Sequence, residues 1–347
     1  MGLASFFFAA ALTASPAAAG QRAAATGQAH LGSVPALGPA LPAISKPGLA
    51  PTPGQASARL EAAVSSPAPG GAPTARAVDY EPGAIGLVQY DGDSSFGDYD
   101  GNVRRLTALA EQAVAKGAKI IVLPEGSSYG YAGADEVWCR PGLAEFGGKR
   151  CRDVSAAAEP IPGGRSTAYW EAFSRRHGVY VVFSVPEADG AAYYNALGVT
   201  GPAGYVMKYR KRLLYKTDKA YASPGTEPGV LETACGRFGL LICMDADPSG
   251  KLIPEYAEMG VDAAIISMDW DDDPNGPYAA HRKFREWALE HGLDIYASDA
   301  APWDGSGRYF ASGAVRERTG LPATGVGVSG VTVHAFQYRR RPAPPAS

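Results

Sequence analysis

The sequence predicts an α/β fold, and three observations support that prediction. Helical patterns alternate with continuous apolar runs, which are typical of strands buried on both faces of a sheet. In the middle of the chain this alternation gives way to short strands joined by glycine turns, as in a β-meander. Residues 21–78 contain no Phe, Trp or Tyr and follow neither pattern. We therefore expect one layered α/β domain that begins near Asp79.

Two strand–helix units and a further strand come first in this domain. Their predicted ranges are strand 84–90, helix 102–116, strand 119–124, helix 166–177 and strand 179–185. The apolar residues of the first helix recur at helical spacing, and Gly117 and Gly178 stand where the two helices should stop. The strand between the helices is an unbroken apolar run, so it should lie inside the sheet.

The meander and a second set of alternating elements complete the domain. The meander strands are predicted at 194–200, 205–209, 230–233 and 238–243. Helix 253–259, strand 263–267, helix 277–291 and strand 294–298 follow. The return of helices alternating with buried strands supports a layered architecture.

Three of the predicted strands end in chemically distinctive residues. Glu125 follows a buried strand, Lys211 lies in the basic run Met207–Arg212, and Cys243 ends a strongly apolar strand. Each is ordinary by itself: a glutamate in a turn, a solvated basic edge and an inert core cysteine. However, α/β folds place ligands at the carboxyl ends of their strands, and a cysteine that emerges beside charged groups can act as a nucleophile.

Together these segments resemble the nitrilase superfamily, the carbon–nitrogen hydrolases, over about residues 80 to 335. The resemblance covers the order Glu, Lys, Cys and five further motifs. In chain order these are Ile161-Pro-Gly-Gly164, Tyr194-Asn195-Ala196, Gly201-Pro-Ala-Gly204, Tyr209-Arg-Lys211 and Gly236-Arg-Phe-Gly239. Any single motif is weak, but their order and spacing make the set specific. The resemblance implies a four-layer αββα sandwich and a single catalytic domain over residues 79–338.

The resemblance also implies roles for three residues. Cys243 matches the nucleophile, Glu125 the general base and Lys211 the stabiliser of the oxyanion, together with the backbone N–H of Met244. A thiol is only slightly ionised at neutral pH, so a neighbouring base must take its proton. Attack on an amide carbon places negative charge on oxygen, which a fixed ammonium stabilises. No metal or organic cofactor is implied.

The chain departs from the family pattern at one position. The family has a second glutamate between Lys and Cys, seven residues before a Pro-Gly end; here Pro224-Gly225 is that end and Asp218 is the matching residue. Aspartate is one methylene shorter, so it would orient Lys211 less closely or through a water. A helix-capping or surface role for Asp218, or a shifted alignment, is the alternative.

We expect the protein to hydrolyse a linear amide of a small molecule through a Cys thioester. Within the superfamily, the chain most resembles the biotinidase and pantetheinase branch, because members of that branch are exported and carry a Cys-flanked insertion similar to residues 138–151. One alternative is a cysteine N-acyltransferase, since the soluble domain of apolipoprotein N-acyltransferase is also similar. Another is a non-catalytic binding protein on the same scaffold. Possible homodimer formation is implied by the resemblance alone.

Candidate substrate-binding residues lie on loops near the predicted nucleophile: Trp270, Met244 and Tyr129. Trp270 has the alternative of a rim aromatic packed on the domain. Residues 271–276 imitate the start of a calcium loop, but Arg282 replaces the glutamate required at its twelfth position. We therefore expect no metal site, and His281 and His291 lack a partner at metal-ligand spacing.

Charge and the two ends of the chain indicate partners and location. The formal net charge is −3, and since residues 21–78 contribute +3 and residues 1–20 none, residues 79–347 carry −6, which argues against nucleic-acid binding. The apolar run 3–13 and the small residues after it predict a signal peptide over 1–20 and a secreted or periplasmic protein; organelle targeting or a cytoplasmic location is the alternative. No later apolar run is long enough for stable membrane insertion.

Two segments are predicted to remain outside the folded domain. Residues 21–78, rich in Ala and Pro, read as a disordered linker, and residues 339–347 as a flexible, basic and Pro-rich tail. Within the domain, Cys139 and Cys151 flank a polar loop, which they would close as a disulfide if the protein is exported; two free thiols are the alternative.

Overall fold

The structure is a computed structural model of the full chain, and it describes residues 80–270, 280–301, 303, 305–312, 317–318 and 329–339. The predicted signal peptide 1–20, the predicted linker 21–78 and nearly all of the predicted tail 339–347 therefore lie outside the described residues. The calcium-like segment 271–276 lies outside them as well.

Two mixed sheets form the centre of the domain. The first has the strand order β15–β1–β2–β6–β7–β8, with bounds Gly330–Phe336, Gly83–Gln89, Ile120–Val122, Tyr180–Asp189, Ala192–Gly201 and Gly204–Arg210. The second has the order β14–β13–β12–β11–β10–β9, with bounds Glu317–Arg318, Gly307–Tyr309, Asp294–Asp299, Ala263–Met268, Gly236–Ile242 and Gly229–Thr233. β1, β2 and β6 are mutually parallel, as are β10, β11 and β12.

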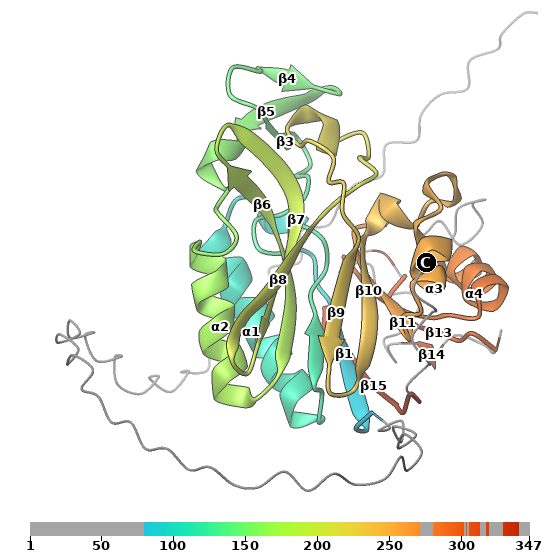
Figure 1. Cartoon of the computed structure of the whole chain (residues 1–347). Coiled ribbons are helices and arrows are strands. Elements are labelled where there is room, and N and C mark those ends of the chain that lie inside the picture. The colour runs from blue at the N-terminus through green and yellow to red at the C-terminus, as the bar shows by residue number, and fades with distance from the viewer. Residues whose placement is uncertain are drawn as a thin grey trace, which may run out of the picture. The chain divides into compact units, whose positions relative to one another are not determined.

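Helices cover the outer face of each sheet. α1 (Tyr99–Ala115) and α2 (Arg165–His177) pack on the first sheet, and α3 (Leu252–Glu258) and α4 (Ala280–His291) pack on the second. Figure 1 shows the resulting order of helices, sheet, sheet and helices across the domain. The four-layer αββα architecture expected from the sequence is confirmed.

Small residues allow the layers to approach each other. In β10, a Cβ on Gly239 would lie 2.6 Å from ring atoms of Tyr256 in α3, so only glycine leaves room for this ring. The Tyr256 hydroxyl donates to the Leu240 carbonyl and accepts from the Gly229 N–H. Gly178 ends α2 in the left-handed conformation, with φ of 67°, which glycine adopts without a Cβ clash.

Buried serine hydroxyls join the two sheets near the ends of their strands. Ser267 of β11 donates to the Leu123 carbonyl, just after β2, at 2.8 Å. Ser298 of β12 lies within hydrogen-bond distance of the carbonyl oxygens of Val88 and Val122. Because a buried carbonyl without a partner is costly, these bonds fix the end of β2 against the second sheet.

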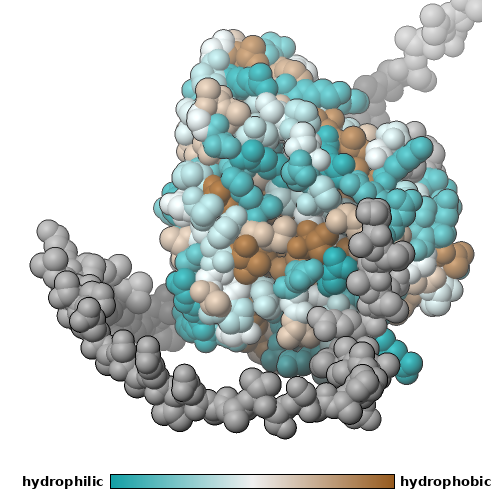
Figure 2. All heavy atoms as spheres, viewed as in Figure 1, coloured by the Kyte–Doolittle hydropathy of each residue, from teal (hydrophilic) through white to brown (hydrophobic). Residues whose placement is uncertain are grey.

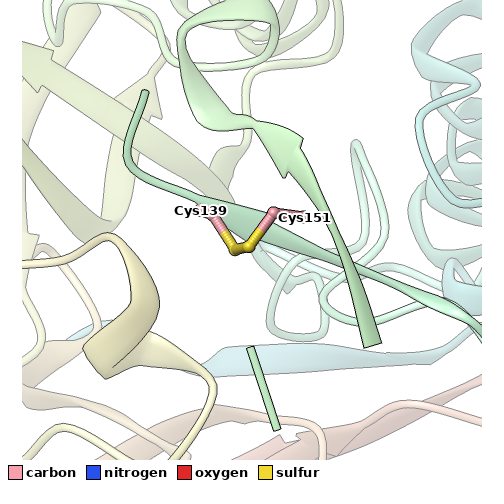
Figure 3. Close-up of a disulfide and its surroundings, with 2 residues drawn as sticks. All are labelled: Cys139 and Cys151. Carbon is pink, nitrogen blue, oxygen red and sulfur yellow. A yellow bond between two sulfur atoms is a disulfide. The ribbon is translucent and has the colours of Figure 1, made fainter. Parts of the chain in front are cut away.

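A small third sheet, which the sequence patterns do not predict, lies at one end of the domain (Figure 1). It consists of β3 (Glu136–Cys139), β5 (Lys149–Asp153) and β4 (Glu145–Phe146). The segment reads as a polar loop because its strands are short and mostly polar. A disulfide between Cys139 and Cys151 joins β3 to β5 (Figure 3), so of the two alternatives the structure contains the bonded pair.

The remaining differences from the predicted elements are small. The strands β13, β14 and β15 follow the last predicted strand and complete the edges of the two sheets. Of the predicted helix 277–291, residues 280–291 are helical and 277–279 lie outside the described residues. None of the helices among the described residues has the length and apolar character needed to cross a membrane.

The face of the domain drawn in Figure 2 carries many hydrophilic residues and a few apolar ones. In the view of Figure 2, apolar residues gather over β8 and β9, and teal, hydrophilic residues surround them. Exposed large apolar side chains include Val206 of β8 and Leu289 of α4.

Candidate active site

The three residues singled out by the resemblance meet at the carboxyl ends of their strands. Glu125 comes shortly after β2, Lys211 directly after β8, and Cys243 directly after β10. β2 and β8 belong to the first sheet and β10 to the second, so the site lies between the two sheets. This edge is where α/β folds commonly build ligand sites.

Lys211 is held between two carboxylates. Its Nζ lies 2.7 Å from Glu125 Oε1 and 2.7 Å from Asp218 Oδ2, and all three side chains are fully buried. A buried ammonium must be paired to persist, and two carboxylates supply that pairing. The ring of Tyr131 lies 5.5 Å from Nζ, as measured to its centroid, and adds a cation–π contact.

Asp218 contacts Lys211 directly despite its shorter side chain. It begins a 3-10 turn, η3 (Asp218–Ala220), which brings its carboxylate to the ammonium without a bridging water. The Tyr215 N–H donates to Asp218 Oδ2 at 2.8 Å and fixes the carboxylate further. The structure therefore places Asp218 in the position expected of the second carboxylate, rather than on the surface.

Asn195 of β7 connects the two carboxylates. Its Nδ2 donates to Glu125 Oε1 at 2.7 Å and to Asp218 Oδ1 at 2.8 Å. The sequence reasoning did not assign Asn195 a role, although the residue stood in one of the motifs that carried the resemblance. Its place in that motif was the signal that could have identified it.

Cys243 occupies a strained turn at the end of β10. It begins the 3-10 turn η4 (Cys243–Ala246), and its φ of 43° is unusual for a residue with a Cβ. Such a conformation costs on the order of 1–3 kcal/mol and persists where the surroundings enforce it. Cys243 as a whole residue is 7% exposed, and its thiol donates to the Asp269 carbonyl at 3.5 Å.

Asp245 enforces this turn, and the sequence reasoning missed it. Its carboxylate accepts from the N–H of Ile242, just before Cys243, and from the N–H groups of Arg212 and Leu213, just after Lys211. One buried carboxylate therefore fixes the nucleophile turn relative to the lysine turn. The position of Asp245 two residues after the cysteine was the available signal.

Glu125 is connected to Cys243 through one residue. The N–H of Asp269 donates to Glu125 Oε2 at 3.2 Å, and the carbonyl of the same residue accepts from the Cys243 thiol. Asp269 follows β11 directly. The candidate base and the candidate nucleophile therefore lie on either side of one backbone position.

The protonation states follow from burial and charge. Burial raises the pKa of Glu125 to about 7, although the ammonium of Lys211 opposes the shift. Burial and the nearby charge of Glu125 raise the pKa of Cys243 well above its usual value. Burial alone would lower the pKa of Lys211, but the charges of Asp218 and Glu125 outweigh it and raise that pKa well above normal. The thiol is therefore neutral at rest beside a carboxyl that titrates near neutrality.

The three predicted substrate-binding residues lie in different environments. Met244 is next to Cys243 in η4 and is partly exposed. Trp270 packs its ring against Phe284 of α4, with 5.5 Å between centroids, which matches the alternative of a rim aromatic.

Tyr129 lies outside the group around Lys211. Its hydroxyl donates to Glu159 and accepts from Arg165, and its ring packs beside Tyr99 and Trp138. The aromatic residue beside Lys211 is instead Tyr131, two positions later in the chain. In this irregular loop, Tyr129 packs in the core, whereas Tyr131, only two positions later, lies at the site.

Within the part of the chain that the structure describes, no group of three His, Cys, Asp or Glu residues is arranged to hold a metal ion. The carboxylates at the site are occupied by an ammonium, an amide and backbone N–H groups.

Comparisons with known proteins show which proteins the chain is similar to. Residues 84–292 match the family described as carbon-nitrogen hydrolase. The chain is 32% identical to a nitrilase of Pyrococcus abyssi over 148 residues, which are 42% of this chain and 50% of that protein. It is 31% identical to the omega-amidase NIT2 of Danio rerio over 214 residues, 58% of this chain and 68% of the relative.

Solved structures share the fold. An amidase from Nesterenkonia sp. superposes with a TM-score of 0.58 at 19% identity, over 76% of this chain and 94% of that chain. The chain spans about half the length of the Pyrococcus abyssi nitrilase.

Proposed function

Since the chain belongs to the carbon–nitrogen hydrolase family, we propose that it is an amidase that hydrolyses a linear amide through a thioester on Cys243. One observation supports this most directly. A fully buried Glu125–Lys211–Asp218 group is connected to the Cys243 thiol through the backbone of Asp269. This places a base, a cation and a nucleophile around one small volume.

The first half-reaction forms the thioester. Glu125 takes the thiol proton, and the sulfur attacks the amide carbon. The oxygen that gains negative charge is stabilised by the Lys211 ammonium and the N–H of Met244. An ammonium has three N–H donors and Lys211 Nζ contacts two carboxylates, so a third N–H can donate to the substrate oxygen. Glu125 then gives its proton to the nitrogen, and the amine leaves as the C–N bond breaks.

The second half-reaction uses water. Glu125 takes a proton from a water molecule, whose oxygen attacks the thioester carbon. The same oxyanion contacts stabilise this step, and the C–S bond breaks. The carboxylic acid leaves, and Cys243 recovers its proton from Glu125, which restores the resting site.

The test is a screen of small linear amides for release of ammonia or amine, with Cys243→Ala and Cys235→Ala as a matched pair. Cys235 is also buried, but it lies near Pro82, away from the site. We expect Cys243→Ala to lower turnover by about 1,000-fold or more, and Cys235→Ala to leave it nearly unchanged. Full turnover by the Cys243→Ala variant would show that Cys243 is not the nucleophile.

An acyltransferase would use the same thioester but pass it to an amine. Adding hydroxylamine or an amine in excess and measuring the partition of products separates the two reactions. We expect carboxylic acid to remain the main product. Dominant transfer to the acceptor would favour the N-acyltransferase, and substrate binding without turnover would favour a binding protein on this scaffold.

We further propose that the protein is exported, as in the biotinidase and pantetheinase branch. The Cys139–Cys151 disulfide supports this, because disulfides persist in oxidising compartments. Fractionation of the producing cells should find the protein in the periplasm or the medium. Recovery in the cytoplasm with both thiols reduced would contradict export.

We also propose a homodimer, an inference from family resemblance. Light scattering of the full-length chain, whose mass is 36.0 kDa, should then give twice that mass. A monomeric mass at micromolar concentration would contradict it.

A further inference from the structure

Asn195 contacts all three members of the buried charge group around Lys211. Its Nδ2 donates to Glu125 Oε1 at 2.7 Å and to Asp218 Oδ1 at 2.8 Å. Its backbone carbonyl accepts from the Lys211 N–H at 2.8 Å. The residue is buried in β7, which pairs with β8, the strand that ends directly before Lys211. Because an amide NH2 group carries two donors and no charge, it is well suited to a place between two carboxylates.

The two oxygens of the Glu125 carboxylate have different surroundings. Oε1 accepts from Lys211 Nζ and from Asn195 Nδ2, both at 2.7 Å. Oε2 accepts from the Asp269 N–H at 3.2 Å, and the carbonyl of Asp269 accepts from the Cys243 thiol. A carboxylate oxygen offers about two lone pairs. The bonds to Lys211 and Asn195 therefore use both lone pairs of Oε1, whereas within the described residues Oε2 has one hydrogen bond and can accept another.

We propose that Asn195 fixes Glu125 by its Oε1, so that Oε2 is the oxygen that takes the proton of Cys243. This inference rests on the proposed function. The proton moves from Sγ to Oε2 and leaves a thiolate, while Oε1 keeps its bonds to the ammonium and the amide. Asn195 is a positioning residue, because it acts through Glu125 and not on the substrate.

The bond from Asn195 also affects the titration of Glu125. Burial raises the pKa of Glu125 to about 7, and the ammonium of Lys211 opposes that shift. A hydrogen bond donated to a carboxylate favours the charged form, so the amide of Asn195 acts in the same direction as the ammonium. Loss of the amide should therefore raise the pKa of Glu125 further. Since Glu125 must be a carboxylate to act as the base, the acid limb of kcat/KM should then move to higher pH.

Two variants of Asn195 and one control separate this role from general stabilisation. Asn195→Leu has a side chain of similar size and shape without a donor. Asn195→Asp keeps the shape but places a third carboxyl beside Glu125 and Asp218, and it carries the test if the leucine variant does not fold. Thr200→Val is the control, because Thr200 lies fully buried in the same strand and its hydroxyl is hydrogen-bonded to that of Ser174 in α2.

None of these substitutions changes a titratable group that acts on Glu125. The titratable groups whose charges interact with Glu125 are Lys211, Asp218, Asp269, Cys243, Tyr131 and Tyr221.

Two readouts allow this inference and the proposed function to fail separately. The first is kcat and kcat/KM for amide hydrolysis as a function of pH. The second is the rate at which iodoacetamide alkylates Cys243 as a function of pH, followed by mass spectrometry, which requires no substrate. Thermal unfolding of each variant shows whether it is folded.

We expect Asn195→Leu to lower kcat and the alkylation rate at pH 7 by about 10- to 100-fold, because the base is less well aligned, with a smaller change in KM. Its acid limb should move up by about one pH unit, the effect of one lost hydrogen bond to a charged group. In Asn195→Asp the limb should move further, because one carboxylate disfavours ionisation of another beside it. Thr200→Val should lower the unfolding temperature and leave both rates and the limb unchanged.

The direction in which the limb moves separates action through Glu125 from action through Asp218. Asn195 also donates to Asp218, so its loss could act by loosening that carboxylate. The charge of Asp218 raises the pKa of Glu125. A loosened Asp218 would raise that pKa less, and the limb would move to lower pH.

The outcomes are decisive for any folded Asn195 variant. A normal kcat overturns the inference, while amide hydrolysis by the parent still supports the proposed function. A lower kcat with a limb that is unmoved or shifted to lower pH also overturns it, as does an equal shift of the limb in Thr200→Val. If the parent hydrolyses no amide but the alkylation profiles shift in the expected order, the positioning role stands and the proposed function fails.

Discussion

At the scale of single residues, the site is defined by how one buried cation is neutralised. Lys211 has no exposed surface, and its charge is balanced by Glu125 and Asp218. Removing one partner of a buried ion pair leaves an uncompensated charge, which is strongly destabilising. The same arrangement places a carboxyl with a near-neutral pKa beside the thiol.

The titration of Glu125 predicts the acid limb of the pH profile. Glu125 must be a carboxylate to accept the thiol proton, and burial raises its pKa to about 7. We therefore expect kcat/KM to increase with pH up to about 7 and then level off. Initial rates from pH 5 to 8 in buffers of constant ionic strength measure this. If kcat/KM instead rose around pH 4.5, the ordinary pKa of a glutamate, burial would not have raised the pKa of Glu125.

Asp218 should be important for catalysis, because it balances the charge of Lys211. In Asp218→Asn the lysine loses one of its two carboxylate partners, so we expect kcat to fall by about 10- to 100-fold. The negative charge of Asp218 raises the pKa of Glu125, so its removal should also shift the acid limb to lower pH.

Asp135→Asn is the control for this change, because Asp135 is an exposed aspartate. Steady-state kinetics across the pH range test both variants. A normal kcat with an unshifted acid limb in Asp218→Asn would exclude the role given to Asp218.

Single residues also show where sequence reasoning stops. Glu125, Lys211 and Cys243 were predicted because each ends a recognisable strand and stands in a motif. Asn195 stood in one of the motifs but received no role, and Asp245 was not singled out, because their functions depend on which neighbours the fold supplies. Tyr129 was predicted to bind substrate and Tyr131 was not considered, since nothing in a local sequence tells which tyrosine of an irregular loop faces the site.

At the scale of elements, the small sheet β3–β5–β4 supports the loop that carries Asp218. Arg140 follows β3, and its backbone N–H donates to the Ala220 carbonyl while its Nε donates to the Tyr221 carbonyl. Ala220 also packs with Val137 and Cys139 in a small apolar cluster. The insertion is therefore connected to the site through η3.

The Cys139–Cys151 disulfide should contribute to stability and, through this loop, to activity. The two cysteines are 12 positions apart in the sequence. Removing their disulfide, as in Cys139→Ser/Cys151→Ser, should lower the free energy of unfolding by about 3 kcal/mol. We expect kcat to fall as well, because Asp218 is then held less firmly. Urea denaturation and steady-state kinetics measure the two effects.

Cys235→Ser is the matched control, since it alters a free cysteine away from this sheet. An unfolding free energy equal to that of the parent in the double serine variant would show that β3 and β5 hold together without the disulfide.

At the scale of the whole molecule, the packing of two sheets creates the site. One core cluster spans both sheets and the helices α3 and α4, and a second joins the first sheet to α1 and α2. The serine hydroxyls at the sheet ends fix the two halves of the site relative to one another. Both cores are built from residues after Tyr80.

These cores predict that the first part of the chain is not needed for catalysis. A chain that lacks residues 1–78 should keep its kcat and its unfolding temperature, because it retains both clusters intact. Expression of residues 79–347 and comparison with the full chain by kinetics and calorimetry test this. A large loss of stability would show that residues 1–78 contribute to the fold.

The sequence alone determined the class of the fold, most of its strands and helices, and the identity of the three central residues. Apolar periodicity and glycine stops are local, and the motifs are short, so both can be recognised in a linear chain. Tertiary structure decided the rest: the small sheet, the contact between Asp218 and Lys211, and the bonds of Asp245 to the turns at Cys243 and Lys211. These depend on groups far apart in the chain, whose protonation and orientation are set only when burial brings them together.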